Sequence, residues 1–422
     1  MEDSEQSTGF FGRLGAGLIT GAADDDPSGI ATYSQVGASY GYGMLWTVLL
    51  ALPLMIGIQT VCARMGRVTG RGLAHNLNSE LPQWLVLGTV TLLLLANVIN
   101  LSADIGAIGA SVQLLVSGPA PLYAAMAAVL SVALQVFVPF ERYSPVLKLL
   151  TLSLFAYVAT VLVVHVPWSE VLQRMVWPHV HFGAKYAVGV VAVLGTTISP
   201  YLFFWQSSQE AQEVRMIARR RPLRKAPKQA EAAFSRINQD TAIGMLFSEI
   251  VAFFIIVTAA AVLHAHGKTD IQTSAQAATA LKPLAGKFAF LLFAGGIVGT
   301  GMLAIPVLAG SGAFALGEVL KWRTGLEAKP SAAKWFYATI AVATLGGMAL
   351  SFLPIDPIKM LFWSAVINGV VAVPLMVVIM WLASRPKVMG KFPLPIWLKS
   401  LGWIATAAMA AAAVGMFVTI GK

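Results

Sequence analysis

Two short segments of the sequence combine residues that bind cations with residues that interrupt helices. They are Asp24-Asp25-Asp26-Pro27-Ser28-Gly29 and Gly195-Thr196-Thr197-Ile198-Ser199-Pro200-Tyr201. Proline removes a backbone donor and clashes with the preceding turn, and a nearby glycine or serine eases unwinding. Carboxylates, hydroxyls and freed main-chain carbonyls are all oxygen ligands. The chemistry that these segments indicate is therefore the binding of a hard cation.

The composition places both segments in a membrane. Of 422 residues, 57% are hydrophobic and only 11% are charged, whereas about a quarter are charged in water-soluble domains. The apolar residues form runs long enough to cross a bilayer, which takes about 20 residues. After a polar N-terminus at 1–9, we expect one transmembrane domain over 10–420, with eleven spans at approximately 10–37, 43–65, 82–116, 119–138, 145–166, 185–210, 240–265, 288–320, 333–353, 357–384 and 394–420.

The basic residues predict the orientation of these spans. Of the 29 lysines and arginines, 21 fall in loops after even-numbered spans and six in loops after odd-numbered spans. The positive-inside rule then places the N-terminus in the cytoplasm and the C-terminus outside, in a plasma (inner) membrane. Eight of these charges follow the sixth span, and we interpret them as a topology signal with some anionic-lipid contact, ahead of a regulatory surface. No basic stripe interleaved with aromatics is present, so no nucleic-acid partner is expected.

The two breaks fall in the first and sixth spans, which cross the membrane in opposite directions. This predicts an all-α polytopic fold with two inverted five-helix repeats, at about 10–166 and 185–384, and an extra helix at 394–420. Non-helical backbone at this depth is tolerated where it is packed in protein or lines a wet cavity. Paired interruptions in two halves are typical of a transport site at the midplane. The alternative is that each proline only kinks its helix.

Asp26, directly before Pro27, is the predicted direct ligand, because a carboxylate at bilayer depth normally faces a cavity and meets a cation. For Asp24 and Asp25, a supporting role at the site and a solvated helix end remain equal alternatives. Neither break contains Cys, Met or His, and oxygen ligands favour magnesium, calcium and manganese. Magnesium keeps several waters and uses one or two carboxylates, so it is our first expectation. Further oxygen donors are expected from Ser28, Thr196, Thr197 and Ser199.

Other polar residues within the spans have two interpretations each. Glu210, just past the second break, predicts an acidic inner vestibule or second ion position, or else a helix end that pairs with the basic loop at Arg215. Asn97, Asn100 and Asp104 share one face of the third span. They predict either a wet pathway or a hydrogen-bonded seam between helices, and we prefer the seam except at Asp104.

The breaks and their surroundings resemble the NRAMP divalent-metal transporters. Residues 15–59, with Asp26-Pro27-Ser28-Gly29 and Tyr40-Gly41-Tyr42-Gly43, are similar to the first two helices of that family, and residues 194–208 are similar to the sixth. Ala103-Asp104-Ile105-Gly106 is similar to part of the third. The resemblance covers most of the chain in span order. It implies a LeuT-type fold and alternating access, with the metal as cargo and no resident cofactor.

The sequence departs from the family pattern at three places. Gly29 stands where the family has an asparagine ligand, and Ser199-Pro200-Tyr201 replaces Met-Pro-His, which removes the thioether that favours manganese and iron. Ala107 replaces an acidic residue of the proton path. These departures resemble the NRAMP-related magnesium transporters, which implies magnesium and manganese transport without proton coupling. Carried over by position, the ion site would comprise Asp26, the backbone near Thr196, Thr197 and Ser199, and a polar residue of the tenth helix, for which Asn368 is the nearest candidate.

Three alternative functions compete with this interpretation. A proton-coupled manganese or iron carrier is disfavoured by the missing methionine and by Ala107. An amino-acid/sodium symporter of the same fold would bind a carboxylate, which three aspartates would repel. An intramembrane aspartyl enzyme would need two catalytic aspartates on separate helices, and the sequence provides only the pair Asp26 and Asp104. We therefore expect a monomeric transporter of divalent metal ions, and no enzyme.

Overall fold

The computed structural model describes residues 20–421, apart from Ala22, 139–141, 143–148, 150–151, His179 and Phe182. The predicted N-terminal segment 1–9, the start of the first span and most of the start of the fifth lie outside the described residues. In the described part of the chain, every regular element is a helix. The all-α prediction is confirmed.

The helices follow the predicted spans closely. The first repeat contains α3 (Pro27–Tyr40), α4 (Leu45–Thr69), α6 (Gln83–Gln113), α7 (Ala120–Phe137) and α9 (Phe155–Val163). The second contains α11 (Ala184–Thr197), α12 (Pro200–Met216), α13 (Ala230–Val262), α16 (Ala289–Val319), α17 (Lys334–Ser351) and α18 (Pro357–Ala383), and α20 (Ile396–Ile420) is the extra helix. Short helices in the connections are α5 (Leu73–Glu80), α10 (Trp168–Val176), α14 (Ser274–Ala278), α15 (Lys282–Ala285) and α19 (Pro386–Met389).

Within the described residues, eight helical stretches are long and apolar enough to cross a membrane. This number is smaller than the eleven predicted spans because two of them form one stretch and two others are not counted. The predicted first two spans form one stretch of 43 residues, Pro27–Thr69, and the helix of the fifth is bent by 119° against α10. The helix of the ninth, α17, begins with the charged Lys334. The protein is a multi-pass membrane protein.

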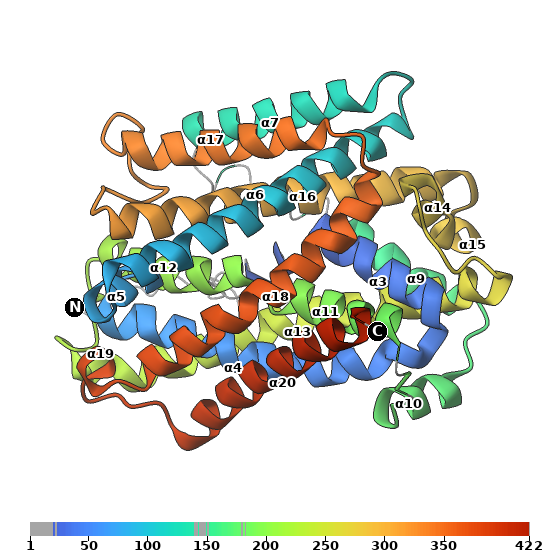
Figure 1. Cartoon of the computed structure of the whole chain (residues 1–422). Coiled ribbons are helices and arrows are strands. Elements are labelled where there is room, and N and C mark those ends of the chain that lie inside the picture. Colours follow the sequence, from blue (N-terminus) through green and yellow to red (C-terminus); the bar gives the residue numbers. More distant parts are fainter. Residues whose placement is uncertain are drawn as a thin grey trace, which may run out of the picture.

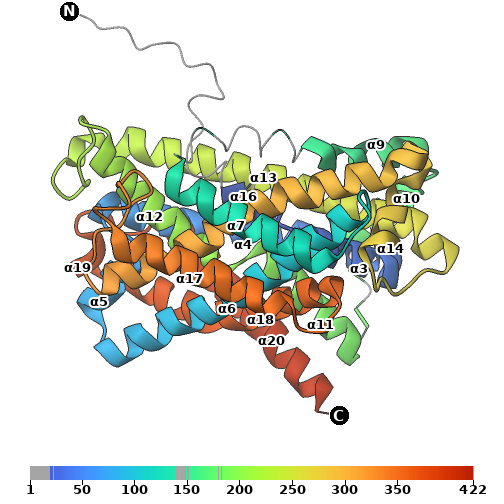
Figure 2. The same cartoon turned by 90° about the horizontal axis from the view of Figure 1, so that it is seen from above.

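The helices pack side by side in one body (Figure 1). Helix α6 contacts α7, α16, α17 and α18, while α13 packs on α3 and α4, α12 on α4, and α11 on α18. In both views α5 and α19 lie at one end of this body, and α10 and α14 lie at the other (Figure 2). The connections after the second and tenth spans therefore share one end, as the alternation of spans requires.

Candidate ion-binding site

The first break lies where the sequence places it. A helical turn ends at Asp24, Asp26 is extended with φ −68° and ψ 170°, and α3 restarts at Pro27. Proline at the first helical position costs no hydrogen bond, because that amide has no partner in a helix. The Asp26 Oδ1 atom accepts hydrogen bonds from the Gly29 amide at 2.8 Å and the Ser28 hydroxyl at 2.5 Å. The carboxylate is thus held at the positive end of α3.

The second break separates α11 from α12. Ile198 and Ser199 leave the helical path, and α12 begins at Pro200. The Ser199 hydroxyl lies 2.8 Å from the carbonyl oxygens of both Gly195 and Thr196 and donates to them. The Thr197 hydroxyl donates to the carbonyl of Val193 at 3.0 Å. Both predicted hydroxyls therefore use their protons to cap the end of α11, and only their oxygen lone pairs remain for a cation.

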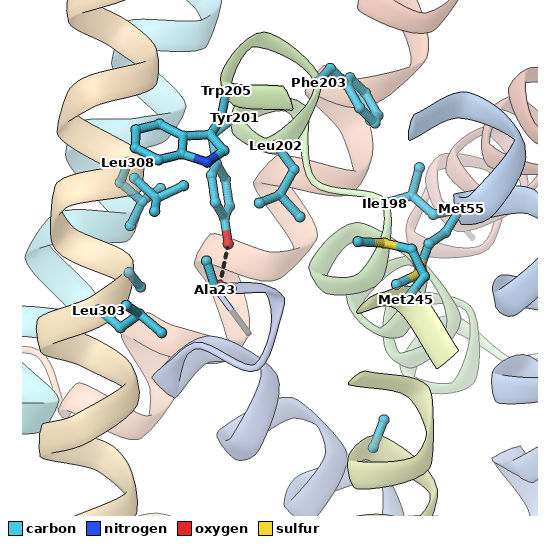
Figure 3. Packing of buried hydrophobic residues seen from close by; sticks show 14 of the residues in the cluster. Ala23, Met55, Ile198, Tyr201, Leu202, Phe203, Trp205, Met245, Leu303 and Leu308 are labelled. Atoms are coloured by element: carbon cyan, nitrogen blue, oxygen red, sulfur yellow. Dashed lines mark hydrogen bonds between the residues drawn. The ribbon is translucent and has the colours of Figure 1, made fainter. Parts of the chain in front are cut away.

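The structure brings the two breaks together. The hydroxyl oxygens of Ser28 and Thr196 lie 3.4 Å apart. The Tyr201 hydroxyl donates to the Ala23 carbonyl at 3.0 Å (Figure 3) and lies 3.4 Å from Asp26 Oδ2. A Cβ atom at Gly29 would stand 3.3 Å from the Thr196 hydroxyl, so the glycine permits this close approach. Hydroxyl groups from both broken helices, those of Ser28 and Tyr201, thus lie beside one carboxylate.

Asn100 completes the surroundings of Asp26. Its Nδ2 atom donates to Asp26 Oδ2 at 3.0 Å. Asn97, three residues earlier on the same helix, instead donates to the Leu308 carbonyl and the Ser311 hydroxyl of α16. Asp104 is fully buried on the same face, and neither of its carboxylate oxygens has a hydrogen-bond partner among the described residues. Both asparagines form buried hydrogen bonds to another helical element, as the seam interpretation predicts, and the bond of Asn100 ends on the predicted ion ligand.

Asp26 receives hydrogen bonds from neutral groups only. It is 2% exposed, and it forms no ion pair with any of the described residues. Burial of an isolated charge is strongly unfavourable unless a partner compensates it. No group of three His, Cys, Asp or Glu side chains in the described part of the chain is arranged to hold a metal ion. A cation at Asp26 would therefore complete its shell with hydroxyl, amide and main-chain oxygens and with water.

The two preceding aspartates point to a different helix. Asp24 and Asp25 are 0% and 2% exposed, which rules out a solvated helix end. The Ser248 hydroxyl of α13 lies 2.6 Å from Asp24 Oδ2 and 3.1 Å from Asp25 Oδ1. Glu249, next to this serine, is also buried, and its carboxylate oxygens have no hydrogen-bond partner among the described residues. Asp25 therefore faces α13, while Asp26 faces α6 and α12.

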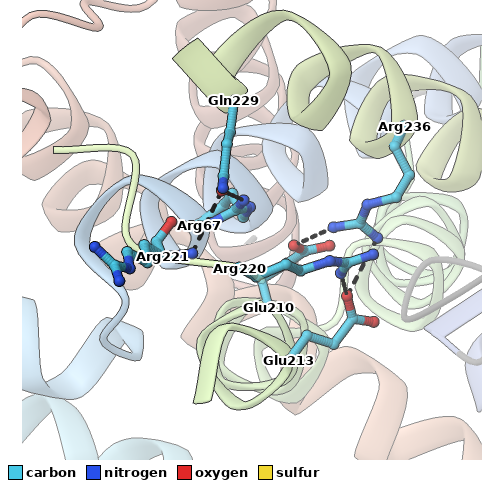
Figure 4. A network of polar contacts seen from close by, with 7 residues as sticks. All are labelled: Arg67, Glu210, Glu213, Arg220, Arg221, Gln229 and Arg236. Carbon is cyan, nitrogen blue, oxygen red and sulfur yellow. Dashed lines mark hydrogen bonds and ion pairs between the residues drawn. The ribbon is translucent and has the colours of Figure 1, made fainter. Parts of the chain in front are cut away.

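Glu210 lies in an ion-pair network at the C-terminal half of α12. Its Oε2 atom is 2.6 Å from the Arg236 guanidinium of α13, which also lies 3.5 Å from Glu213. Glu213 pairs in turn with Arg220 of the following loop (Figure 4). The Glu210 side chain is 0% exposed and that of Arg236 is 20% exposed. The interpretation of Glu210 as a paired helix end is supported, with Arg236 as its partner in place of Arg215.

The tenth-span candidate, Asn368, lies on α18 beside the end of α11. Its neighbour Gly369 packs on Gly195, and a Cβ at Gly195 would overlap the Ala365 carbonyl of α18. Asn368 is 1% exposed, and its amide nitrogen has no hydrogen-bond partner among the described residues. No hydrogen bond joins it to Asp26 in that part of the chain. Its amide is available near the second break.

A cavity of about 740 Å³ opens between the helices that carry the two breaks. It is lined by the last turns of α3 and the first turns of α11 and α18, including Gln35, Lys185 and Lys359. Since α11 and α12 form one interrupted span, this cavity and the Glu210–Arg236 network lie toward opposite ends of that span. The Asp26 site lies between them.

An all-helical membrane protein in which two spans of opposite direction break against each other has the architecture of a LeuT-type fold. The sequence profile of the natural resistance-associated macrophage protein-like (Nramp) family matches residues 17–419. The chain therefore belongs to the Nramp family, and it is a transporter and not an enzyme.

Individual relatives agree with this assignment. The chain is 26% identical to the divalent metal cation transporter MntH of Klebsiella pneumoniae, over 93% of this chain and 91% of that one. It is 28% identical to the MntH protein of Erwinia tasmaniensis, over 70% of each chain. The crystal structure of the Eremococcus coleocola manganese transporter matches with a TM-score of 0.72 at 17% identity, covering 100% of this chain and 89% of that one. Mhp1, a nucleobase-cation-symport-1 family transporter, matches with a TM-score of 0.56 at 15% identity, over 96% and 92% of the two chains.

Proposed function

We propose that this protein carries a divalent metal ion across the plasma membrane by alternating access, through the site at Asp26, with Mg²⁺ as the preferred cargo and Mn²⁺ as a second. One observation carries the proposal. A buried carboxylate stands between two helix breaks, is held by Ser28, Gly29 and Asn100, and pairs with no cationic side chain of the described residues. The printed names of the relatives, divalent metal cation and manganese transporters, support a divalent cargo.

The preference for magnesium rests on the donor set. The groups that surround Asp26 offer oxygen or amide nitrogen, and Ser199 stands at the residue before Pro200. Magnesium binds through one or two carboxylates and retains several waters, while sulfur ligands favour softer metals. Asp26, Thr196 and the main chain at Ser199 would hold such a partly hydrated ion. Thr197, Gly29 and Asn368 would shape its surroundings.

The proposed path of the ion follows from what lies at the two ends of the interrupted span formed by α11 and α12. In the proposed orientation, the cavity between α3, α11 and α18 opens to the outside, and the Glu210–Arg236 network closes the cytoplasmic side. An ion would enter through the cavity and reach Asp26 between the breaks. Release would require the helices that carry the network to separate, because Arg236 bridges α13 to both glutamates of α12.

The second candidate is a proton-coupled manganese carrier. It is favoured by the buried Asp104, whose carboxylate lacks a partner among the described residues and lies one turn of α6 from Asn100. Ala107 in place of an acidic residue supports transport without proton coupling. The two candidates differ in whether protons accompany the metal.

Proteoliposomes with an internal pH dye test the proposal. We expect uptake of Mg²⁺ and Mn²⁺, slower uptake of Ca²⁺ and Cd²⁺, and no change of internal pH beyond that of protein-free liposomes. Cadmium uptake equal to magnesium uptake would contradict the magnesium preference. Internal acidification in proportion to manganese uptake would establish the proton-coupled alternative.

A further inference from the structure

The basic loops meet around a second cavity, at the opposite end from the one that opens beside α3. This cavity of about 440 Å³ is lined by the α4–α5 connection, α5, the loop between α12 and α13, and α19. Its charged side chains are Arg71, Arg224, Lys225 and Lys387, all exposed, and the single acid Glu80. The positive-inside rule explains why basic residues occur on one side of the membrane. It does not explain why connections after the second, sixth and tenth spans bring four of them into one cavity.

The walls of this basic cavity are fixed by backbone hydrogen bonds. The amides of Leu223 and Arg224 donate to the carbonyls of Arg67 and Val68 at the end of α4, each at 3.3 Å. The Leu223 side chain is fully buried. Gly70 ends α4 with φ 68°, and a Cβ there would press on the ring of Pro222. The loop backbone is therefore held against the end of α4, which fixes the positions from which its basic side chains extend.

Two of the basic side chains are oriented by neighbours. The Arg224 guanidinium donates to the carbonyls of Lys387 and Val388, which ties the loop to α19. Arg71 Nη1 lies 2.7 Å from His75 Nε2. Burial, together with the charges of Arg71 and Lys321, lowers the pKa of His75, so its ring is neutral near pH 7 and accepts from Arg71.

The remaining charges are left without compensation. Lys387 lies 2.9 Å from Glu80, which balances one of the four cations. The Lys225 ammonium forms no hydrogen bond or ion pair with any described residue, although its main-chain amide donates to the Pro222 carbonyl at 2.8 Å. Three positive charges gathered in a polar hollow attract an anion, and arginine with lysine is the pairing that proteins use for phosphate groups. The volume is in the range of small-ligand sites.

We propose that this cavity binds a phosphate-bearing anion, either a soluble polyphosphate or the headgroup of an anionic phospholipid. The ligand would connect Arg71, Lys225 and Arg224, which belong to three separate connections. It would thereby stabilise the arrangement of α4, α5 and α19 found in this structure. This site is independent of the ion site at Asp26, and the test below measures binding and not transport.

Two probes separate the sources of the phosphate. Purified protein in phosphatidylcholine nanodiscs is titrated with inorganic pyrophosphate in metal-free buffer by calorimetry. In parallel, the phosphatidylglycerol retained by the protein from mixed nanodiscs is counted by native mass spectrometry. The variants are Lys225→Gln, Arg71→Gln/Lys225→Gln, and the matched control Lys228→Gln, which removes an exposed charge of the same loop that does not line the cavity.

We expect one of the probes to bind the unaltered protein. Lys225→Gln should weaken that binding by about fivefold, as expected for one partly exposed charge contact, and the double variant should weaken it further. Lys228→Gln should leave it unchanged, and the probe that responds identifies the source. The proposal is overturned if neither probe binds, if Lys225→Gln has no effect, or if Lys228→Gln weakens binding as much as Lys225→Gln.

Discussion

Two buried carboxylates near the helix breaks, Asp26 of the first span and Glu210 of the sixth, differ in the charge of the groups that contact them. Glu210 meets the guanidinium of Arg236 at 2.6 Å, so its charge is balanced inside the protein. Within the described part of the chain, Asp26 accepts hydrogen bonds from neutral donors only, among them Ser28, Gly29 and Asn100. In the proposed function, the carboxylate with a cationic partner belongs to the scaffold, and the one held by neutral donors binds the transported ion. Burial of an acid alone therefore does not indicate an ion site. The absence of a cationic partner does not suffice either, because Asp104 and Glu249 also lack one among the described residues; what distinguishes Asp26 is its position between the two helix breaks.

The largest effect is expected from Asp26→Asn. Asparagine caps a helix as well as aspartate does, so α3 should persist while the charge that attracts the metal is lost. Uptake of Mg²⁺ and Mn²⁺ into proteoliposomes should fall to the level of protein-free liposomes. Asp356 is a matched control, because it also precedes a proline and caps its helix, accepting from the Ile358 amide at 2.9 Å. Asp356→Asn should retain uptake. An equal loss of uptake in both variants would show that the loss comes from weakened helix capping and not from weakened ion binding.

Glu210→Gln should act on stability instead of ion binding. Removing one partner of a buried ion pair costs about 3 kcal/mol, and Glu213, which also lies 3.5 Å from Arg236, should offset part of this cost. The melting temperature of the purified protein should fall, and the Glu210→Gln/Arg236→Gln double variant should regain part of the loss. The concentration of Mg²⁺ that gives half-maximal uptake should stay unchanged. A large rise in that concentration with no loss of stability would place Glu210 on the ion path.

The sequence could predict those features that depend on local chemistry. Each break follows from a proline with small or polar neighbours, and the helix limits follow from apolar runs between breakers. The partner of Glu210 could not be found this way, because Arg236 approaches only after the intervening loop folds back. Asn97 and Asn100 are identical in type and three residues apart on α6, and which of them faces Asp26 depends on the rotation of that helix in its packing. In the same way, side-chain direction determines that Asp25 faces α13 while Asp26 faces α6 and α12.

A smaller effect is expected from Asn100→Ala. A hydrogen bond to a charged group contributes about 1.5–3 kcal/mol, so loss of this donor should raise the half-maximal Mg²⁺ concentration roughly tenfold. Asn97→Ala is the matched control, since Asn97 bonds α16. It should lower the melting temperature and leave the half-maximal concentration unchanged. The reverse pattern would exclude Asn100 from the site.

The smallest change is expected from Ser199→Cys, which keeps the size of the side chain and adds a soft ligand at the second break. The ratio of Cd²⁺ to Mg²⁺ uptake should rise by a few-fold, because thiolate favours soft metals. Ser131→Cys, buried on α7, is the control and should leave the ratio unchanged. An unaltered ratio in Ser199→Cys would show that this position does not contribute to selectivity.

Direct metal binding distinguishes the two carboxylates most clearly. Mn²⁺ binding to the purified protein can be counted by electron paramagnetic resonance for the unaltered chain, Asp26→Asn and Glu210→Gln. The ion site at Asp26 predicts one bound Mn²⁺ per chain in the unaltered protein and in Glu210→Gln, and none in Asp26→Asn. Binding that survives Asp26→Asn, or that disappears in a folded Glu210→Gln variant, would contradict it.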